Sequence, residues 1–502
     1  MSTHIPLKEI YIGNIDGEEE SSRTNFEQLF YTKNSKFNDI MRPEKFIITG
    51  RKGTGKTILA NYIVKKINEN KKSYSRVLRK NDFKLQKLID LEYRELKEDD
   101  RSLFWKWFFL LQFGKVLVEE RKTQIKLPFT PERKLNKFIK TKYPEDIFKL
   151  IDFNKSSTTK SKVRGKTSTI DSSIEESYGN NKNYGHKQFY ELLSQLKQLV
   201  FQCLKKNNEI TLIYDDLDEI EERVNESPNY YKLLISMLET IKELNLDFKK
   251  FNKKSTKIIV LLRSDIVEEI HKYSSNSNKL TTEGEVKLYW LSKNANPPAS
   301  HPLIEMILYK VQKSVPNYQN LDNNSLYKIL FPKKLHGKEA VDYLLNFSFG
   351  RPRDIIHYLN LIIKNNPEAT FFEPQYFYNC SQEYSSWFFN ELLNEISIHE
   401  NKEALHDCLT LIMDMKKFNF NLDSIQSLYI NNQIQYPNIS NLKNTLGQLY
   451  KLGVIGNSWE HTRNKKGKKI YHFSWGHRED SRKDLNLSQD FVVHYGFRKH
   501  FT

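Results

Sequence analysis

The chain has 502 residues, of which 38% are hydrophobic and 28% charged, with 31 Phe and 27 Tyr. At about 150 residues per domain this length predicts two to four domains, and so many aromatic side chains exclude a mostly disordered chain. The formal net charge of +17 favours a nucleic acid or another polyanion as a partner, but Lys and Asn are spread throughout the chain, so the charge equally fits a basic surface without one.

No segment has the composition of a membrane span or of a secretory signal. The longest apolar stretch, residues 103–118, is interrupted by two lysines and a glutamine, whereas a span needs roughly 20 apolar residues. The first residues lack a basic region followed by an apolar one. The cysteines, Cys203, Cys380 and Cys408, are far apart and form no CxxC pair, which argues against disulfides and zinc. We expect a soluble, cytoplasmic protein without a membrane partner.

The first strong motif follows a short strand-like run at residues 46–49. Residues 50–57 read GRKGTGKT, a full match to GxxxxGK[ST], and the next ten residues have helical spacing. In such a loop the backbone N–H groups turn toward phosphate oxygens, and the helix N-terminus adds a partial positive charge. Lys56 would reach the β- and γ-phosphates, and Thr57 would offer its hydroxyl to Mg²⁺. The sequence therefore predicts ATP and Mg²⁺ as cofactors, with ATP bound by Gly50, Arg51, Lys52, Gly53, Thr54, Gly55, Lys56 and Thr57.

A long insertion follows the P-loop helix. Residues from about 80 to 150 are predicted to be a helical insertion, in which Trp105 and Trp107 are core side chains. Residues 154–185 are rich in Ser, Thr, Lys, Asn and Gly, which is typical of a disordered, solvated loop.

Two further apolar runs predict strands that end in polar residues. Residues 210–214 lead into Asp215 and Asp216, and residues 257–262 lead into Arg263. We assign Asp215 to the Mg²⁺ site and Asp216 to orientation of the attacking water. Arg263 would point toward the γ-phosphate if its strand lies beside the Asp215 strand, and an ion pair with Asp265 is the alternative. Apolar runs that alternate with helices predict an α/β fold, a parallel sheet with helices on both faces.

From about residue 302 the spacing is helical, and a helix begins near GRPRD. Its Arg351 and Arg353 either approach the phosphates as charge-stabilising residues or are structural. The C-terminal region has a leucine-rich helix that ends before Gly453, then a strand, the basic turn RNKKGKK and another strand. This order is typical of a winged helix. The predicted domains are an N-terminal segment (1–45), the P-loop core (46–300), a helical lid domain (301–400) and a winged-helix-like domain (401–502).

The order of these motifs carries a family resemblance. GRKGTGKT, LIYDDLDE, VLLRSDI and GRPRDII, with the opening YIGNIDGEEES and the winged-helix-like end, resemble the AAA+/STAND-related (ASCE) P-loop ATPases of bacteria. Within them the chain is similar to a group found near phage-defence genes. The resemblance implies ATP-driven switching in a homo-oligomer with a separate effector protein, with Walker A at residues 50–57 and Walker B at Asp215 and Asp216. It also implies Arg263 as the first sensor and Arg351 or Arg353 as the second.

One departure from this family bears on the rate of turnover. AAA+ proteins commonly place Glu after the metal-binding Asp, whereas this chain has Asp216, so we expect Mg²⁺-dependent ATP hydrolysis to be slow. The leading hypothesis is an ATPase switch subunit of a multi-component anti-phage defence system. The alternative is a nucleic-acid-binding module that uses ATP for assembly, with DNA or RNA held by the basic turn. An effector enzyme is less favoured, because HExxH and GxSxG are absent and the ExK tripeptides are too short to be specific.

Overall fold

The computed structural model describes residues 5–79, 98–121, 125–142, 192–204, 209–215, 228–251, 256–274, 277–292, 296–397, 399, 401–463, 469–479 and 481–502. The chain divides into two compact units. Unit 1 comprises Met1–Lys36, Gly50–Leu59 and Leu288–Thr502, and unit 2 comprises Phe37–Thr49 and Ala60–Lys287.

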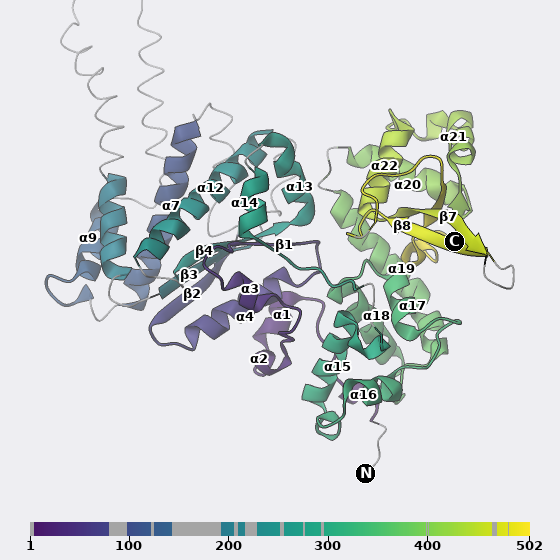
Figure 1. The fold of residues 1–502 in the computed structure, drawn as a ribbon, viewed down its shortest axis with the longest axis horizontal. Helices are drawn as coiled ribbons and strands as arrows, with labels where there is room; N and C mark the ends of the chain where they lie inside the picture. The colour runs from purple at the N-terminus through teal and green to yellow at the C-terminus, as the bar shows by residue number, and fades with distance from the viewer. Residues whose placement is uncertain are drawn as a thin grey trace, which may run out of the picture. The chain divides into compact units, whose positions relative to one another are not determined.

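Unit 2 is built on a five-stranded parallel sheet with the strand order β2-β3-β4-β1-β5 (Figure 1). The predicted strands are present, which confirms the α/β class. Two strands were not predicted: the second contains Ser73, Ser75 and Arg76 among its six residues, and the fifth has three residues. The bounds are β1 Ile47–Gly50, β2 Ser73–Leu78, β3 Glu209–Tyr214, β4 Lys257–Arg263 and β5 Glu285–Lys287.

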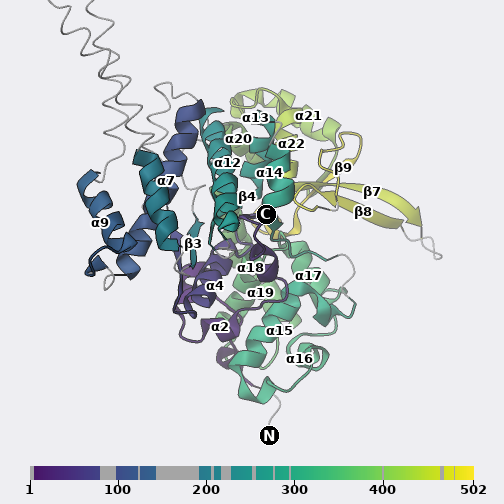
Figure 2. The same cartoon turned by 60° about the vertical axis from the view of Figure 1, so that its left-hand side comes forward.

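Both faces of this sheet are buried. Leu212 and Tyr214 of β3 share one apolar core with Trp105 and Trp107, while Ile213 between them faces the other way and is equally buried. Figures 1 and 2 show α7 and α12 on one side of the sheet and α4 on the other. The helices are α3 Phe37–Ile40, α4 Lys56–Asn68, α7 Glu98–Glu120, α9 Pro131–Lys142, α12 Pro228–Lys250, α13 Ser264–Tyr273 and α14 Ser277–Gly284. The predicted loop at 154–185 lies outside the described residues.

The first part of unit 1 is helical, as the spacing after residue 302 predicts. Its core is rich in stacked rings, for example Tyr358 on Tyr384 at 4.1 Å between ring centroids. A proline at the first position of α18 and of α19 favours the helix start, because proline has no N–H to leave unsatisfied. The helices are α1 Gly17–Ser22, α2 Phe26–Leu29, α15 Pro302–Ser314, α16 Asn323–Leu330, α17 Ala340–Phe347, α18 Pro352–Asn365 and α19 Pro374–Ile396, with 3₁₀ turns η1 Leu7–Glu9, η2 Pro298–Ser300 and η3 Pro316–Tyr318.

The last part of unit 1 combines helices with an antiparallel sheet of strand order β6-β9-β7-β8. The predicted helix and the two strands that follow it occur in that order, and Gly453 caps the helix in the left-handed region at φ +88°. The basic turn itself, residues 464–468, lies outside the described residues. The elements are α20 Lys402–Asp414, β6 Asn419–Phe420, α21 Leu422–Asn431, η4 Gln433–Gln435, α22 Leu442–Leu452, β7 Ile455–Arg463, β8 Lys469–Trp475, β9 Asp490–Val493 and η5 Tyr495–Phe497.

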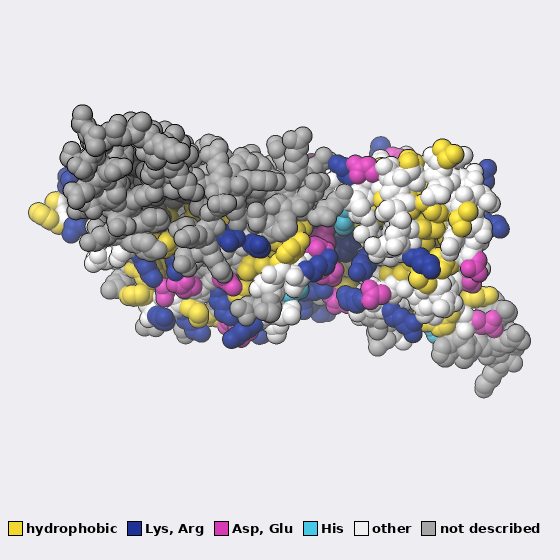
Figure 3. All heavy atoms as spheres, turned by 90° about the horizontal axis from the view of Figure 1, so that it is seen from above, with side chains coloured by type: hydrophobic (Ala, Val, Ile, Leu, Met, Phe, Trp, Pro, Cys, Tyr) yellow, Lys and Arg dark blue, Asp and Glu magenta, His cyan; other side chains and the backbone are white. Residues whose placement is uncertain are grey.

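The structure bears on the predictions about a membrane span, the cysteines and the distribution of charge. In the described part of the chain no helix combines the length and the hydropathy of a membrane span. The three cysteines are buried thiols, as expected of core residues. Among the described residues visible in Figure 3, Asp and Glu side chains lie between groups of Lys and Arg side chains, so the positive charge there does not form one continuous patch.

Candidate functional site

The GRKGTGKT segment forms a tight loop between β1 and α4. Gly53 and Gly55 have φ of +83° and +95°, a region that favours glycine. A Cβ on Gly53 would also lie 3.0 Å from the Cβ of Arg353. The loop is closed by the Thr54 hydroxyl, which donates to the Arg51 carbonyl at 2.8 Å, and by Trp290, whose indole N–H donates to the Thr54 carbonyl at 2.9 Å. These bonds fix the loop backbone in one conformation.

The two residues predicted to meet phosphate and metal lie at the start of α4. The Lys56 ammonium donates to the carbonyls of Gly50 at 3.1 Å and Arg51 at 3.4 Å, so it lies across the loop. Thr57 is the second residue of the helix and is partly buried. The first turn of α4 contains no acidic residue that would offset the positive end of the helix dipole. A positive helix end without an acidic side chain beside it favours the binding of an anion such as a phosphate chain.

The predicted metal and sensor residues end two strands of the parallel sheet. Asp215 follows β3 and is 4% exposed, and Arg263 is the last residue of β4 and is 6% exposed. Because parallel strands end at the same edge, Asp215, Arg263 and the end of β1 share one edge of the sheet. β4 pairs with β3, which is the arrangement that the proposed role of Arg263 requires. Asp216 lies outside the described residues.

Arg263 also forms the ion pair that was its alternative role. Its Nε donates to Asp265 Oδ1 at 3.1 Å, and its Nη2 donates to Asp265 Oδ2 at 2.6 Å. This bidentate geometry holds the guanidinium close to the end of β4. In the described structure Arg263 is therefore a paired arginine at the sheet edge.

No cluster of three or more His, Cys, Asp or Glu side chains suited to a metal occurs among the residues that the structure describes. A P-loop magnesium does not need one, because Mg²⁺ is commonly held by one or two protein oxygens together with phosphates and water. The Thr57 hydroxyl and the Asp215 carboxylate are oxygen donors of the kind that Mg²⁺ prefers.

The two arginines at the start of α18 differ sharply in their surroundings. Arg351 is 1% exposed: its Nε donates to both Asp354 oxygens at 3.0 Å, and its Nη1 donates to the Lys52 carbonyl at 3.1 Å. Burial alone would lower the pKa of Arg351, but the charges of Asp354 and Glu395 raise it above the usual value. Arg351 therefore holds the P-loop backbone as a permanently charged group.

Arg353 is partly exposed and lies directly beside the loop. Its side chain is 26% exposed, its Nη1 is 3.1 Å from Glu391 Oε2, and its backbone N–H donates to the Gly53 carbonyl at 3.4 Å. Of the two predicted arginines, Arg353 is the one whose guanidinium is not enclosed.

Two glutamates of α19 that the sequence analysis missed bind the cations of this region. Glu395 pairs with Arg51 at 2.9 Å and with Arg351, while Glu391 pairs with Arg353 and lies 3.7 Å from the Lys52 ammonium. Glu391 and Glu395 are four residues apart, so they share one face of the helix. That spacing was the only signal in the sequence, and it did not identify the partners.

Arg51 connects the loop to the C-terminal elements of the same unit. Its Nη2 donates to the Leu452 carbonyl at 3.1 Å, at the last residue of α22, where a cation is favoured by the helix dipole. Its guanidinium also lies 4.6 Å from the ring centroid of Phe349. A P-loop side chain is thus bonded both to α19 and to the end of α22.

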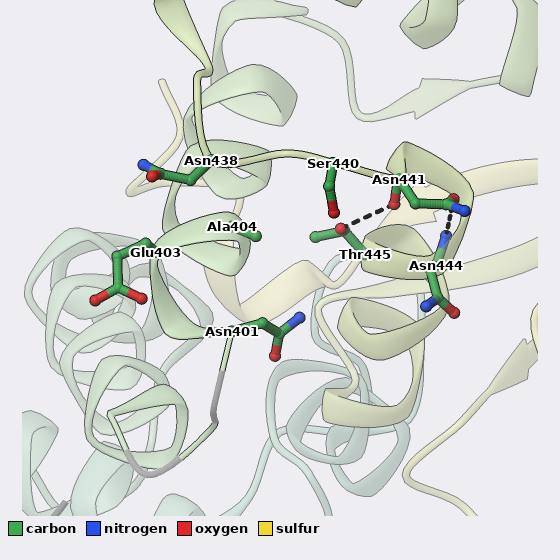
Figure 4. A pocket seen from close by; sticks show the side chains of 8 residues that line it. All are labelled: Asn401, Glu403, Ala404, Asn438, Ser440, Asn441, Asn444 and Thr445. Atoms are coloured by element: carbon green, nitrogen blue, oxygen red, sulfur yellow. Dashed lines mark hydrogen bonds between the residues drawn. The ribbon is translucent and has the colours of Figure 1, made fainter. Parts of the chain in front are cut away.

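A separate hollow in unit 1 is drawn in Figure 4. Amide and hydroxyl side chains dominate its lining, and the two bonds drawn there lie at the start of α22: the Asn444 N–H donates to Asn441 Oδ1, which caps the helix, and the Thr445 hydroxyl donates to the Asn441 carbonyl, each at 3.0 Å. The lining has one carboxylate and, among the described residues, no cation, so it does not suit a phosphate. It consists of Asn401, Glu403, Ala404, Asn438, Ser440, Asn441, Asn444 and Thr445.

The comparison with protein families gives one match. A family model described as "FunZ-associated C-terminal helical domain" matches residues 301–393. The matched range contains α15 to most of α19, including Arg351, Arg353 and Glu391, and ends before Glu395. It does not extend to residues 50–57. No curated protein matches the chain.

Proposed function

We propose that the protein is an ATP-binding and Mg²⁺-dependent ATP-hydrolysing switch. The observation that carries the proposal is the GRKGTGKT loop between a buried parallel strand and a helix, with Lys56 and Thr57 in the first turn of that helix. A complete P-loop motif in this strand–loop–helix context is the established setting for nucleoside triphosphate binding.

In this proposal each of the named residues has its own role. The loop N–H groups and Lys56 bind the phosphates, and Thr57 with Asp215 holds Mg²⁺, which would offset the negative charge of the β- and γ-phosphates when bound. Asp216 orients the attacking water. Arg263, released in part from Asp265, responds to the γ-phosphate.

Arg353 is the better candidate for an arginine that stabilises charge on the phosphates. Its partly exposed guanidinium and its contact with Gly53 support this role, whereas Arg351 is enclosed by Asp354, Glu395 and the Lys52 carbonyl. We propose that Arg351 positions the loop and that Arg353 acts on the nucleotide.

The bonds of Arg51 suggest how nucleotide state would reach the rest of unit 1. A shift of the loop on binding phosphate would alter the bonds from Arg51 to Glu395 and to the Leu452 carbonyl. The second bond lies at the junction of α22 and the β7–β8 hairpin, the elements that we interpret as winged-helix-like. The switch would therefore change the presentation of that domain to an effector protein.

The biological setting remains a proposal from likeness. The resemblance to bacterial AAA+/STAND-related ATPases, together with the match to a FunZ-associated helical domain, supports a cytoplasmic homo-oligomeric subunit of a multi-component anti-phage defence system.

The alternative function is a nucleic-acid-binding module that uses ATP for assembly. The antiparallel pair β7–β8 supports it, because the segment that joins the two strands, residues 464–468, has the basic sequence NKKGK. Replacement of Lys465, Lys466, Lys468 and Lys469 by Glu should then abolish salt-dependent retention of DNA or RNA, and unchanged retention would remove this alternative.

Phosphate release from ATP by the purified chain tests the proposed activity. We expect slow release that requires Mg²⁺ and is lost in Lys56→Ala and in Asp216→Asn, while Lys71→Ala, an exposed lysine of the loop after α4, behaves as the parent. Release that is equal in Lys56→Ala and the parent would contradict the proposal. Stimulation by double-stranded DNA would favour a role for nucleic acid.

A further inference from the structure

A second hollow of unit 1, about 440 Å³ in volume, lies where α17 and the first turns of α19 meet η5. Five of its twelve lining residues are Tyr or Phe. Tyr343 and Phe347 of α17 stack at 4.4 Å between ring centroids, and Tyr495 lies 6.2 Å from Phe347. Tyr378 of α19 also lines the hollow and is 54% exposed, which is high for a large aromatic side chain. The hollow therefore offers ring faces to a ligand.

The same hollow is cationic. The Lys338 ammonium lies 5.0 Å and the Arg498 guanidinium 4.0 Å from the ring centroid of Tyr495, and the Lys499 ammonium lies 5.0 Å from that of Tyr378. No Asp or Glu is among the lining residues, and none of the three cations forms an ion pair with a described carboxylate. The Arg498 Nε also donates to the Val493 carbonyl at 3.1 Å, but this partner is neutral. Cations whose partners are rings or neutral groups keep a charge that can attract an anion.

The combination of aromatic rings and three cations in this hollow restricts the class of ligand. Three cations favour an anion, and aromatic walls favour a planar ring, so an inorganic anion would use only the first feature and an apolar molecule only the second. The volume falls in the range of small-molecule sites, which runs from about 300 to 1,000 Å³. The polar hollow of Figure 4, with a carboxylate and neutral amides, has neither feature.

We propose that this hollow binds a nucleotide, with the base stacked on the exposed ring of Tyr378 and the phosphate held by Lys338, Arg498 and Lys499. The nucleotide is either a free mononucleotide or one unit of a single-stranded nucleic acid, since both present a base and a phosphate. The site shares no residue with the P-loop, so this proposal does not depend on the proposed ATPase activity.

The test uses the full chain carrying Lys56→Ala, which removes the proposed phosphate contact of the P-loop. Two probes separate the sources: AMP by equilibrium dialysis, and a fluorescein-labelled oligothymidylate of about 12 nucleotides by fluorescence anisotropy. Tyr378→Ala and Lys499→Glu change the site; Tyr378 is 54% exposed and Lys499 is partly exposed, so neither substitution removes a core side chain. Phe371→Ala and Lys334→Glu are matched controls, because both are exposed and outside the lining.

We expect at least one probe to bind, and each site variant to weaken binding by about tenfold or more while the controls leave it unchanged. Binding of AMP identifies a free nucleotide, and binding of the oligonucleotide alone identifies a strand. If neither probe binds, or if either Tyr378→Ala or Lys499→Glu leaves the Kd unchanged, the proposal is overturned. If the oligonucleotide binds only at the β7–β8 hairpin, Tyr378→Ala and Lys499→Glu would leave its Kd unchanged, and the proposal would be overturned.

Discussion

Unit 1 contains two groups of cationic side chains with opposite kinds of partner. The cations in and around the GRKGTGKT loop, Arg51, Lys52, Arg351 and Arg353, face the carboxylates of Glu391, Glu395 and Asp354. The pocket cations, Lys338, Arg498 and Lys499, rest on aromatic rings.

The difference indicates what each group can do. A buried cation that is neutralised by a carboxylate mainly fixes geometry, and its removal leaves the partner charge uncompensated. A cation over a ring, without a carboxylate, remains free to attract an anionic ligand. The first group is thus suited to holding the P-loop in place, and the second to binding.

The largest expected effect is on Glu395, which neutralises two arginines. Glu395→Ala would leave the charge of Arg351 partly uncompensated in a buried site, and we expect the free energy of unfolding to fall by about 3–5 kcal/mol. Urea unfolding of the purified variant measures this. The control is Glu403→Ala, which changes an exposed glutamate of α20. Equal urea midpoints for the two variants would contradict the view that the buried pairs of Glu395 stabilise the fold.

The next effect concerns the acid stability of α18 and α19, two helices that pack together and carry Arg353, Glu391 and Glu395. His357 of α18 stacks on Trp387 at 3.9 Å; burial lowers its pKa to about 4, although the charge of Glu391 acts in the opposite direction. Below pH 6.5 the unfolded chain binds a proton that the folded chain does not, so stability falls as the pH drops toward 4. At pH 4 this loss reaches up to about 3 kcal/mol.

His357→Phe keeps a stacking ring and removes the titration. Urea unfolding at pH 7.5 and at pH 4.5 should therefore show a smaller loss of stability in the variant than in the parent. Parallel losses in the two proteins would mean that His357 is not the group that confers this pH dependence.

The third effect concerns Arg353, which is paired with Glu391 and yet is proposed to stabilise charge on the phosphates. Arg353→Ala should lower the rate of ATP hydrolysis at saturating Mg²⁺-ATP by roughly 10- to 100-fold, because charge on the phosphates loses a positive partner. The free energy of unfolding of Arg353→Ala should change little, since the Arg353 side chain is partly exposed. Lys364→Ala, an exposed lysine of the same helix, should be inert, and an unchanged rate in Arg353→Ala would assign Arg353 a structural role.

The smallest effect is expected at Lys52. Its ammonium lies 3.7 Å from Glu391 and its side chain is 33% exposed, so the pair contributes less than about 1 kcal/mol and is screened by salt. Lys52→Ala should shift the urea midpoint only slightly, and less at high salt than at low salt. A shift as large as that of Glu395→Ala would mean that the partly exposed Lys52–Glu391 pair stabilises the fold as much as the buried pairs of Glu395.

These features differ in how far the sequence could predict them. The P-loop is a contiguous motif, and β1, β3 and β4 are continuous apolar runs because both sheet faces are buried. The strand β2 was missed because its polar residues interrupt the run. Partners distant in sequence could not be predicted either: Arg51 and Glu395 are 344 residues apart, and only the fold brings them together. The aromatic hollow was missed for the same reason, since α17 and η5 are joined by tertiary packing alone.

The most direct test of the central claim is equilibrium binding of ATP to the full chain, measured by calorimetry with Mg²⁺ and again with EDTA. We predict a tight, Mg²⁺-dependent site in the parent and in Lys71→Ala, weaker binding with EDTA, and loss of that site in Lys56→Ala. ATP binding that is indifferent to both Mg²⁺ and Lys56 would contradict the assignment of residues 50–57 as the nucleotide site.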